Sequence, residues 1–147
     1  MKKKTNKMIY KIIAKYIKDL KFEIPNPNAF FLLSKNIANY KINIDITSNQ
    51  VKEKIVEVQT TLALNPIQAR EKDKINTKII YSTIVEINGD ISEREKLEDI
   101  ILVKVPNEIY PALRQIFIFL FEQSGFKDIK IDNNVDFKKL YKAKSIQ

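Results

Sequence analysis

The segment Val105–Phe126 constrains the possible folds of this chain more than any other stretch. Read at helical spacing, its apolar residues cover one face and continue most of the way round the helix. They are Ile109, Ala112, Leu113, Ile116 and Leu120 on that face, and Tyr110, Phe117, Ile118 and Phe121 beyond it. A helix that is apolar on nearly all sides must be covered on nearly all sides. We therefore expect one side to pack on its own domain and the other on a second copy of the chain.

A membrane span is the rival interpretation of this helix, and we reject it on length. The unbroken apolar run, Ile116–Phe121, is far shorter than the ~20 residues that a bilayer requires. The end of the helix is well marked. Gly125 suits the left-handed position after a helix, and Phe126 supplies the apolar contact that often follows it.

The amino-acid composition excludes most enzyme classes. The sequence contains no cysteine and no histidine, so it lacks thiol nucleophiles, catalytic imidazoles, and thiolate or imidazole metal ligands. It has only two glycines, too few for a loop that cradles phosphates. No close pair of carboxylates lies in an apolar setting that favours acid–base catalysis. We expect neither enzymatic activity nor a cofactor or metal site.

The net charge of +8 raises the question of nucleic-acid binding. Only three of the 26 basic residues are arginines, the usual readers of phosphates and bases. The lysines are spread along the whole chain, so a basic nucleic-acid-binding domain is the less favoured alternative. A length of 147 residues indicates a single domain, with residues 1–7 as a mobile lysine-rich lead-in and residues 142–147 as a mobile tail.

Three segments show the alternation of apolar and polar residues that is typical of strands. They are Tyr40–Ile46, followed by a turn at Thr47–Gln50, then Val56–Leu64 and, after a polar connection at Asn65–Lys74, Ile75–Ile87. Met8–Ile24 fits either an amphipathic helix or a further strand, and its β-branched and aromatic residues favour the strand. Alternating strands with short connections indicate an antiparallel meander with one covered face.

The stretch after Met8–Ile24 is expected to be a loop. Pro25–Asn28 breaks any regular element, and the apolar residues Ala29–Leu33 follow it directly. Two adjacent phenylalanines, Phe30 and Phe31, cannot both point inward in an extended loop. The loop either caps the core or offers an apolar contact surface to a partner.

Helices are expected after the strands. Ser92–Glu95 has the form of a capping box, which predicts a helix from Glu93 with Leu97, Ile100 and Ile101 on its apolar face. Asp136 can cap a last short helix. Strands first and helices last predict an α+β fold, in which a four-stranded antiparallel meander carries the helices on one face.

Several of these segments resemble, in order, the SecB family of bacterial protein-export chaperones. Tyr16–Asn26 is similar to the first strand of that family and its exit, and Tyr81–Ile87 to the end of its fourth strand. The rest of the chain is similar, in order, to the helical half of the family. The similar residues are Pro106-Asn107, Tyr110-Pro111, Arg114, Gly125-Phe126 and the segment Val135–Tyr141. The resemblance runs from about Tyr16 to Tyr141 and rests on the ordered set, since no single motif is diagnostic. It favours a strand at Met8–Ile24.

The resemblance implies a cytoplasmic holdase that works without ATP. SecB-like chaperones are tetramers, dimers of dimers, that hold unfolded precursor proteins in apolar grooves and pass them to the translocase motor SecA. The groove would be lined by Phe30, Phe31, Leu32, Leu33, Tyr40, Tyr81, Leu97 and Ile101. The contact between copies would include Tyr110, Leu113, Phe117, Ile118 and Phe121. SecA would dock on Asp19 and Glu23, which lie four residues apart and so on one face of a strand.

Two features depart from the family pattern. Lys78 stands where the family carries a further acidic docking residue, and Ser82-Thr83 replaces its usual glycine-rich position. Family members are also typically acidic, whereas this chain is basic, and a reversed charge weakens long-range attraction to a basic partner surface. A SecB-like chaperone that serves a toxin–antitoxin pair is therefore the second interpretation.

Overall fold

Four antiparallel strands form one sheet in the computed structural model, which describes residues 9–36, 41–65, 71–89, 92–126 and 129–146. The strands are β1 (Ile9–Glu23), β2 (Lys41–Lys52), β3 (Ile55–Asn65) and β4 (Asn76–Asn88). Their order across the sheet is β1-β4-β3-β2. The expected meander holds only for β2, β3 and β4. The strand β1 lies beside β4 instead of β2, which gives the sheet Greek-key order.

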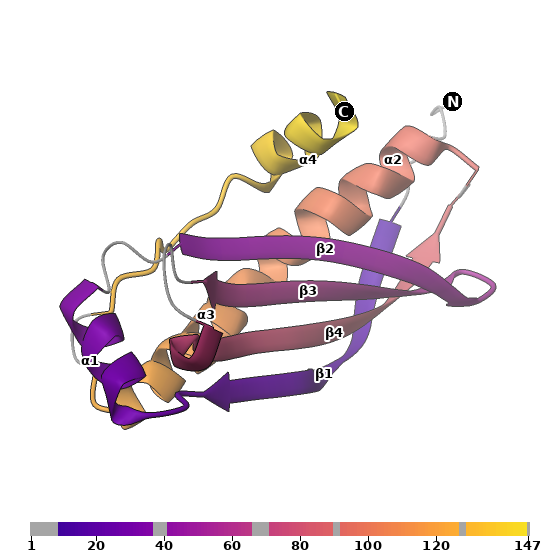
Figure 1. Ribbon diagram of the computed structural model, residues 1–147. Helices are drawn as coiled ribbons and strands as arrows, with labels where there is room; N and C mark the ends of the chain where they lie inside the picture. Colours follow the sequence, from indigo (N-terminus) through magenta and orange to yellow (C-terminus); the bar gives the residue numbers. More distant parts are fainter. Residues whose placement is uncertain (1–8, 37–40, 66–70, 90–91, 127–128, 147) are drawn as a thin grey trace, which may run out of the picture.

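The helices lie on one face of the sheet and at its margins (Figure 1). They are α1 (Pro27–Asn36), the 3₁₀ turn η2 (Glu71–Asp73), α2 (Arg94–Asp99), the π-helical turn η3 (Ile100–Lys104), α3 (Val105–Gln123) and α4 (Phe137–Ile146). The elements α2, η3 and α3 follow one another without a break and cross behind the sheet in Figure 1. The α+β fold with a four-stranded antiparallel sheet is confirmed, as is the strand at the N-terminal end.

The hairpin between β2 and β3 is longer than the sequence predicted. Residues Thr47–Gln50 were expected to turn, but they continue β2 and pair with Val56–Gln59 of β3. The chain turns instead around Lys54, which has a φ of +63°. Pairing with β3 keeps these polar residues extended, although they lack the apolar alternation that reveals a covered strand face.

The segment expected as a loop after β1 is the helix α1. Asn26 caps it, because its Oδ1 accepts a hydrogen bond from the backbone N–H of Ala29 at 2.8 Å. Pro27 is the first helical residue, where a missing N–H has no cost. The run Pro25–Asn28 therefore starts a helix as well as ending a strand. Helical spacing also separates the two phenylalanines, since Phe30 is half-buried and Phe31 is exposed.

The ends of the other helices follow the predicted signals in part. The helix α2 begins at Arg94, with Glu93 at the N-cap position and no side-chain cap hydrogen bond from it. Asp136 caps α4 as expected, its Oδ1 accepting the backbone N–H of Lys139 at 3.0 Å. This helix continues to Ile146, through the segment expected as a mobile tail. The expected lead-in, residues 1–7, lies outside the described residues.

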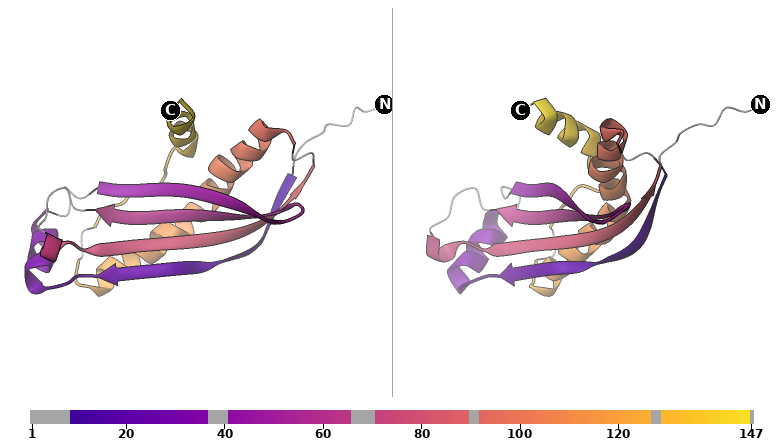
Figure 2. Two further views of the ribbon diagram at one scale, coloured as in Figure 1. Left: turned by 45° about the vertical axis from the view of Figure 1, so that its right-hand side comes forward. Right: turned by 90° about the vertical axis from the view of Figure 1, so that its right-hand side faces the viewer.

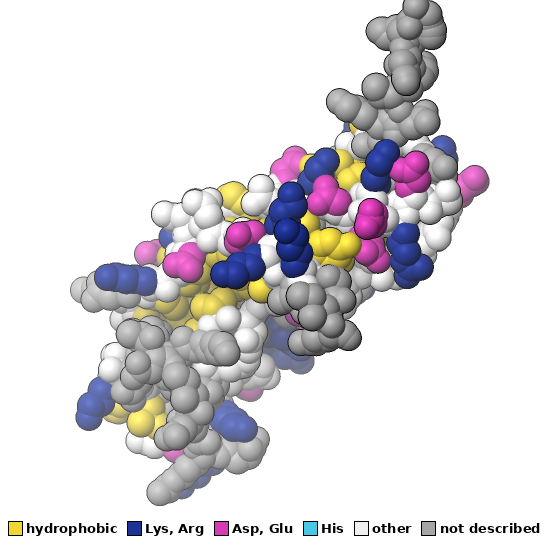
Figure 3. Space-filling view, turned by 90° about the horizontal axis from the view of Figure 1, so that it is seen from above, with side chains coloured by type: hydrophobic (Ala, Val, Ile, Leu, Met, Phe, Trp, Pro, Cys, Tyr) yellow, Lys and Arg dark blue, Asp and Glu magenta, His cyan; other side chains and the backbone are white. Residues whose placement is uncertain are grey.

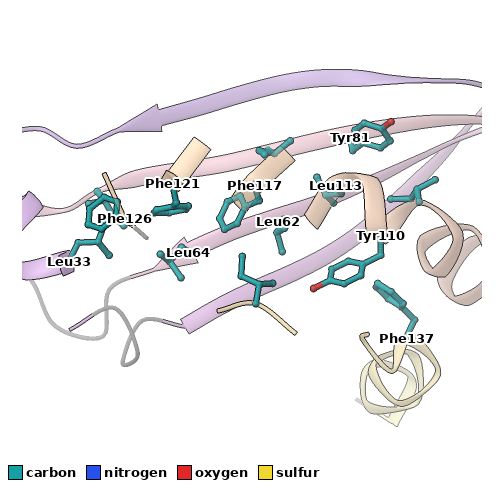
Figure 4. Packing of buried hydrophobic residues seen from close by; sticks show 14 of the residues in the cluster. Leu33, Leu62, Leu64, Tyr81, Tyr110, Leu113, Phe117, Phe121, Phe126 and Phe137 are labelled. Carbon is teal, nitrogen blue, oxygen red and sulfur yellow. The ribbon is translucent and has the colours of Figure 1, made fainter. Parts of the chain in front are cut away.

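The main core lies between α3 and the sheet (Figure 4). Four fully buried residues of α3 face inward: Ile109, Leu113, Phe117 and Phe121. Phe121 is the aromatic centre, with ring centroids at 4.9 Å from Phe22, 5.1 Å from Phe117 and 5.9 Å from Phe126. A second cluster lies under η3 and joins Ile100, Ile101 and Val105 to the sheet at Val56, Val58, Val85 and Ile87. The helix α3 is therefore held along its length by its own subunit.

The end of α3 matches the expected glycine motif. Gly125 has a φ of +96°, and its N–H donates to the Glu122 carbonyl at 3.1 Å. The N–H of Phe126 donates to the Phe121 carbonyl at 3.0 Å, which completes a Schellman motif with its apolar contact. This turn sends the chain back along the sheet toward α4.

The strand β1 is irregular and lies at the edge of the sheet. Its register against β4 shifts between Ile12 and Ala14 and again between Ile17 and Asp19. Bulges of this kind bend a strand and increase its twist. Figure 2 shows β1 and β4 curving at the end of the sheet near the chain's N-terminal side.

Truncating Phe117 to Ala should destabilise the subunit by roughly 3–5 kcal/mol. The ring is fully buried, and its removal leaves a cavity in the core. Urea unfolding followed by circular dichroism measures the free-energy change. The control is Phe31→Ala, whose side chain is 66% exposed and whose loss should cost about 0.5 kcal/mol or less. Equal losses in the two variants would contradict the assignment of Phe117 to the core.

Candidate functional site

A groove of about 640 Å³ opens between the edge of β2 and the segment that leads into α4. Its apolar lining consists of Ile42 and Ile44 from β2, Tyr110 from α3, Ile131 and Val135 from the segment, and Leu140 from α4. Its polar lining consists of Asn43, Lys130, Asp132, Asn134, Asp136 and Lys139. Figure 3 looks down on the side of β2 and α4, where hydrophobic side chains reach the surface among basic and acidic ones.

One wall of the groove is residues 129–136, which we call the strap. The hydroxyl of Tyr110 donates to the Asp132 carbonyl at 2.8 Å, and Nε of Arg114 donates to the Ile131 carbonyl at 3.0 Å. Burial raises the pKa of Tyr110, so its hydroxyl keeps the proton that it donates. The ring of Tyr110 also meets Phe137 at 5.9 Å, at the start of α4 (Figure 4). The strap is thus attached to α3 through its backbone.

The other wall is a sheet edge. Among the described strands, β2 pairs with β3 alone. Every second backbone N–H and C=O of β2 therefore points away from the sheet, which makes this edge a template for a further strand. Ile42 and Ile44 lie two residues apart and present their side chains on the same side. The groove therefore offers backbone hydrogen-bonding groups beside an apolar surface.

The residues that the sequence analysis assigned to a groove in α1 lie at different depths. Leu33 is fully buried in the core, and Phe30 is half-buried against Phe126 with ring centroids 4.8 Å apart. Leu32 is also partly covered. Phe31 is the only one of the four that is largely exposed, and its ring meets Phe30 edge-on at 5.7 Å. Of this set, only Phe31 and the partly covered Phe30 and Leu32 can offer surface to a ligand.

The other predicted groove residues do not join that set. Tyr81 belongs to the main core, and Leu97 and Ile101 belong to the cluster under η3. Tyr40 lies outside the described residues. The sequence analysis missed Ile42, Ile44, Ile131, Val135 and Leu140 as groove residues, although two signals were present. Ile42 and Ile44 alternate on a strand, and Leu140 lies on the apolar face of an amphipathic helix.

The predicted contact between copies also needs correction. Tyr110, Leu113, Phe117 and Phe121 are buried in the core of their own subunit and leave no surface for a second chain. Ile118 is partly exposed. The outward side of α3 carries Phe119, which is 56% exposed. The apolar surface of α3 therefore splits into a side used by its own sheet and a side that is open.

Asp19 and Glu23 lie on the face of the sheet opposite to α3, which we call the open face. Their Cα partners on β4 are Ile80 and Asn76, so both side chains point to this face, as expected from their spacing. Lys21 lies between them and has Lys78 as its partner. Glu23 is exposed and Asp19 half-buried, so the predicted docking pair is partly accessible, and it has two lysines beside it.

A buried carboxylate also lies on the open face. Glu57 is only 7% exposed, and its Oε2 accepts a hydrogen bond from the Ser82 hydroxyl at 2.6 Å and from Lys18 Nζ at 3.1 Å. The hydrogen bond from Ser82, helped by Lys18, holds the pKa of Glu57 below its usual 4.5 although burial acts in the opposite direction. The ion pair of Glu57 with Lys18 joins β3 to the second bulge of β1.

A family model described as "Preprotein translocase subunit SecB" matches residues 3–147. The chain belongs to the SecB family. A putative protein-export protein SecB of Pelagibacter ubique is 40% identical over 136 residues, which cover 92% of this chain and 96% of that protein. The protein-export protein SecB of Rhodospirillum rubrum is 29% identical over 133 residues, which cover 89% of this chain and 79% of that protein. Members of the family are chaperones in protein export.

A solved structure shares the fold of this SecB-family chain. It is the Mycobacterium tuberculosis Rv1957 SecB-like chaperone in complex with a ChAD peptide from the Rv1956 HigA1 antitoxin. The TM-score is 0.53 at 12% sequence identity, and the match covers 84% of this chain and 90% of the other. Among the helices described here, none is long and apolar enough to cross a membrane. The described residues also contain no group of three acidic side chains placed to bind a metal ion.

Proposed function

We propose that this protein is an ATP-independent holdase of the cytoplasm that binds unfolded precursor proteins in the groove between β2 and the strap. The observation that carries the proposal is the combination of a free strand edge with an apolar lining in a chain of the SecB family. Unfolded chains expose the same two features, apolar side chains and unpaired backbone groups. No catalytic group is required, because holding is an equilibrium of binding and release.

Client binding would follow the geometry of strand addition. An extended client segment would pair with the β2 edge and place every second side chain on Ile42, Ile44 and the apolar residues of the strap. Backbone pairing recognises no particular sequence, which suits a chaperone with many clients. Phe31 on α1 would offer a second apolar contact for the same client. Several weak contacts along one client raise the overall affinity.

Replacing Leu140 by Asp should weaken client binding roughly tenfold or more, because it removes apolar contact and places a charge in the groove wall. Leu140 is 40% exposed, so the fold should survive. Light scattering of a urea-diluted apolar client without ATP, at two salt concentrations, measures the protection. The control is Val51→Asp, a residue that is 51% exposed at the distant end of the β2–β3 hairpin. Undiminished protection by the Leu140 variant would exclude the groove.

The assembly would be a tetramer, a dimer of dimers, built from two open apolar surfaces. One is the outward side of α3 around Ile118 and Phe119. The other is the edge of β1, which pairs with β4 alone among the described strands and exposes Ile13, Ile17 and Leu20. Exposed apolar surface beside a free strand edge favours association with another chain.

Replacing Phe119 by Asp should reduce the molar mass of the assembly in solution, because a carboxylate would be buried between copies without a partner. Size-exclusion chromatography with multi-angle light scattering measures the mass. Phe31→Asp serves as the control, since it makes the same change on another exposed phenylalanine. An unchanged mass for the Phe119 variant would remove α3 from the interface between dimers.

Delivery to the translocase motor SecA would use the open face of the sheet. Glu23 is exposed there and Asp19 is half-buried, and neither forms an ion pair among the described residues. The face is also free of α2, α3 and α4, which leaves room for a partner while the groove holds a client (Figure 1). Docking and client binding would therefore take place on separate surfaces.

Asp19→Lys and Glu23→Lys should each weaken SecA binding roughly two- to tenfold, as expected for a charge at an accessible contact. Isothermal titration calorimetry with SecA from the same bacterium measures the affinity. Glu53→Lys makes the same charge change in the β2–β3 turn and should have no such effect. Equal effects of all three changes would indicate general charge attraction rather than docking on this face.

Service to a toxin–antitoxin pair is the second candidate function. It is favoured by the antitoxin peptide bound to the M. tuberculosis structural neighbour. At 12% sequence identity, however, the similarity to that neighbour supports a shared fold and not a shared function. Export proteins are the more similar relatives. Client range separates the two functions, because an export holdase protects unrelated unfolded proteins and a dedicated antitoxin chaperone protects one.

A further inference from the structure

The open face carries two lysines directly opposite each other. Lys21 of β1 and Lys78 of β4 are Cα partners in neighbouring antiparallel strands, so their side chains leave the sheet side by side. On the far side of Lys78, its partner on β3 is Ala63, whose small side chain leaves space next to the lysine. Lys21 is exposed and Lys78 is half-buried, so the pair forms a positive site that a partner can reach from one side of the sheet.

Two other lysines of β1 on this face are matched by an acid. Lys11 of β1 has Glu86 as its Cα partner on β4, and Lys18 forms its ion pair with Glu57. Lys21 and Lys78 form no ion pair among the described residues, and each has the other as its neighbour. Like charges directly opposite each other destabilise a sheet modestly. For Lys11 and Lys18 the acid lies across the sheet on another strand, whereas the residue across from Lys21 and from Lys78 is the other lysine.

The acids nearest to the pair lie along β1 rather than across from it. Asp19 and Glu23 are two residues before and two residues after Lys21 on the same face. The result is a mixed pattern in which a double positive charge lies between two single negative charges. A partner that matched only the acids would bring its cations against the lysines.

We infer that Lys21 and Lys78 form a carboxylate-binding pair within the SecA docking surface, so that the matching SecA surface is of mixed charge. A carboxylate of SecA would lie between the two ammonium groups, and cations of SecA would meet Asp19 and Glu23. The bound carboxylate would remove the repulsion within the lysine pair and accept charge-assisted hydrogen bonds from it. This inference rests on the proposed docking of SecA on the open face and adds its charge pattern.

The test compares SecA binding by full-length Lys78→Glu, Lys21→Glu and Lys78→Thr variants with the wild type, by calorimetry at low and moderate salt. We expect five- to tenfold weaker binding for each Glu variant and a smaller loss for Lys78→Thr. Lys78→Thr should also unfold at slightly higher urea concentration, because it relieves the repulsion. A purely structural role for Lys78 would not lower SecA affinity while raising stability. Lys138→Glu on α4 makes the same charge change away from the face and should bind SecA as the wild type does.

Two outcomes would overturn the inference, and they differ. If the wild type binds SecA and Lys78→Glu binds it equally well or more tightly, the docking surface recognises cations alone and only the lysine pair loses its role. If the wild type does not bind SecA, the proposed docking fails and the inference fails with it. Unchanged client protection in the same variants shows that each of them is folded.

Discussion

The packing of α3 on one face of the sheet is the interaction on which the other features depend. Leu113, Phe117 and Phe121 are fully buried there, and the Schellman turn at Gly125 follows directly from the end of this helix. The same helix supplies Tyr110 and Arg114, which hold the strap beside β2. If α3 shifted on the sheet, the strap would move with it and the groove would change width. The core and the binding surface are therefore one mechanical unit.

The strands β3 and β4 and the first half of β2 were predictable because one face of each is covered, and alternation reports that cover directly. The position of β1 beside β4 was not, since no local pattern in Ile9–Glu23 names its neighbour. The helix α1 was missed because proline reads as a breaker, although Asn26 and Pro27 are also a helix start. Periodicity showed that α3 is apolar on many sides, but it cannot tell a side that meets its own sheet from one that meets a second copy. The groove combines β2 with residues 130–140, and segments so far apart share no sequence pattern.

The two faces of the sheet divide the proposed tasks by physical character. The face that carries the helices holds the apolar surfaces, which suit unfolded clients and association between copies. The open face holds charged groups on short spacings, which suit a folded partner whose own charges are fixed in place. The ion pair between the buried Glu57 and the exposed Lys18 links β1 to β3 on that face without contributing a free charge. Positions of charge, more than the net value of +8, therefore set what this surface can recognise.

The manner in which the strap is attached has a consequence for how the protein can diversify. Tyr110 and Arg114 donate hydrogen bonds to the backbone carbonyls of Asp132 and Ile131, respectively. Every amino acid has such a carbonyl. Lys130 and Asn134 of the strap line the groove, and no side-chain hydrogen bond described above joins them to α3. Substituting them would alter the groove lining without releasing the strap from α3. The side chains of this wall can thus change to suit new clients while the hydrogen bonds that hold its backbone persist, as in a variable loop on a constant framework.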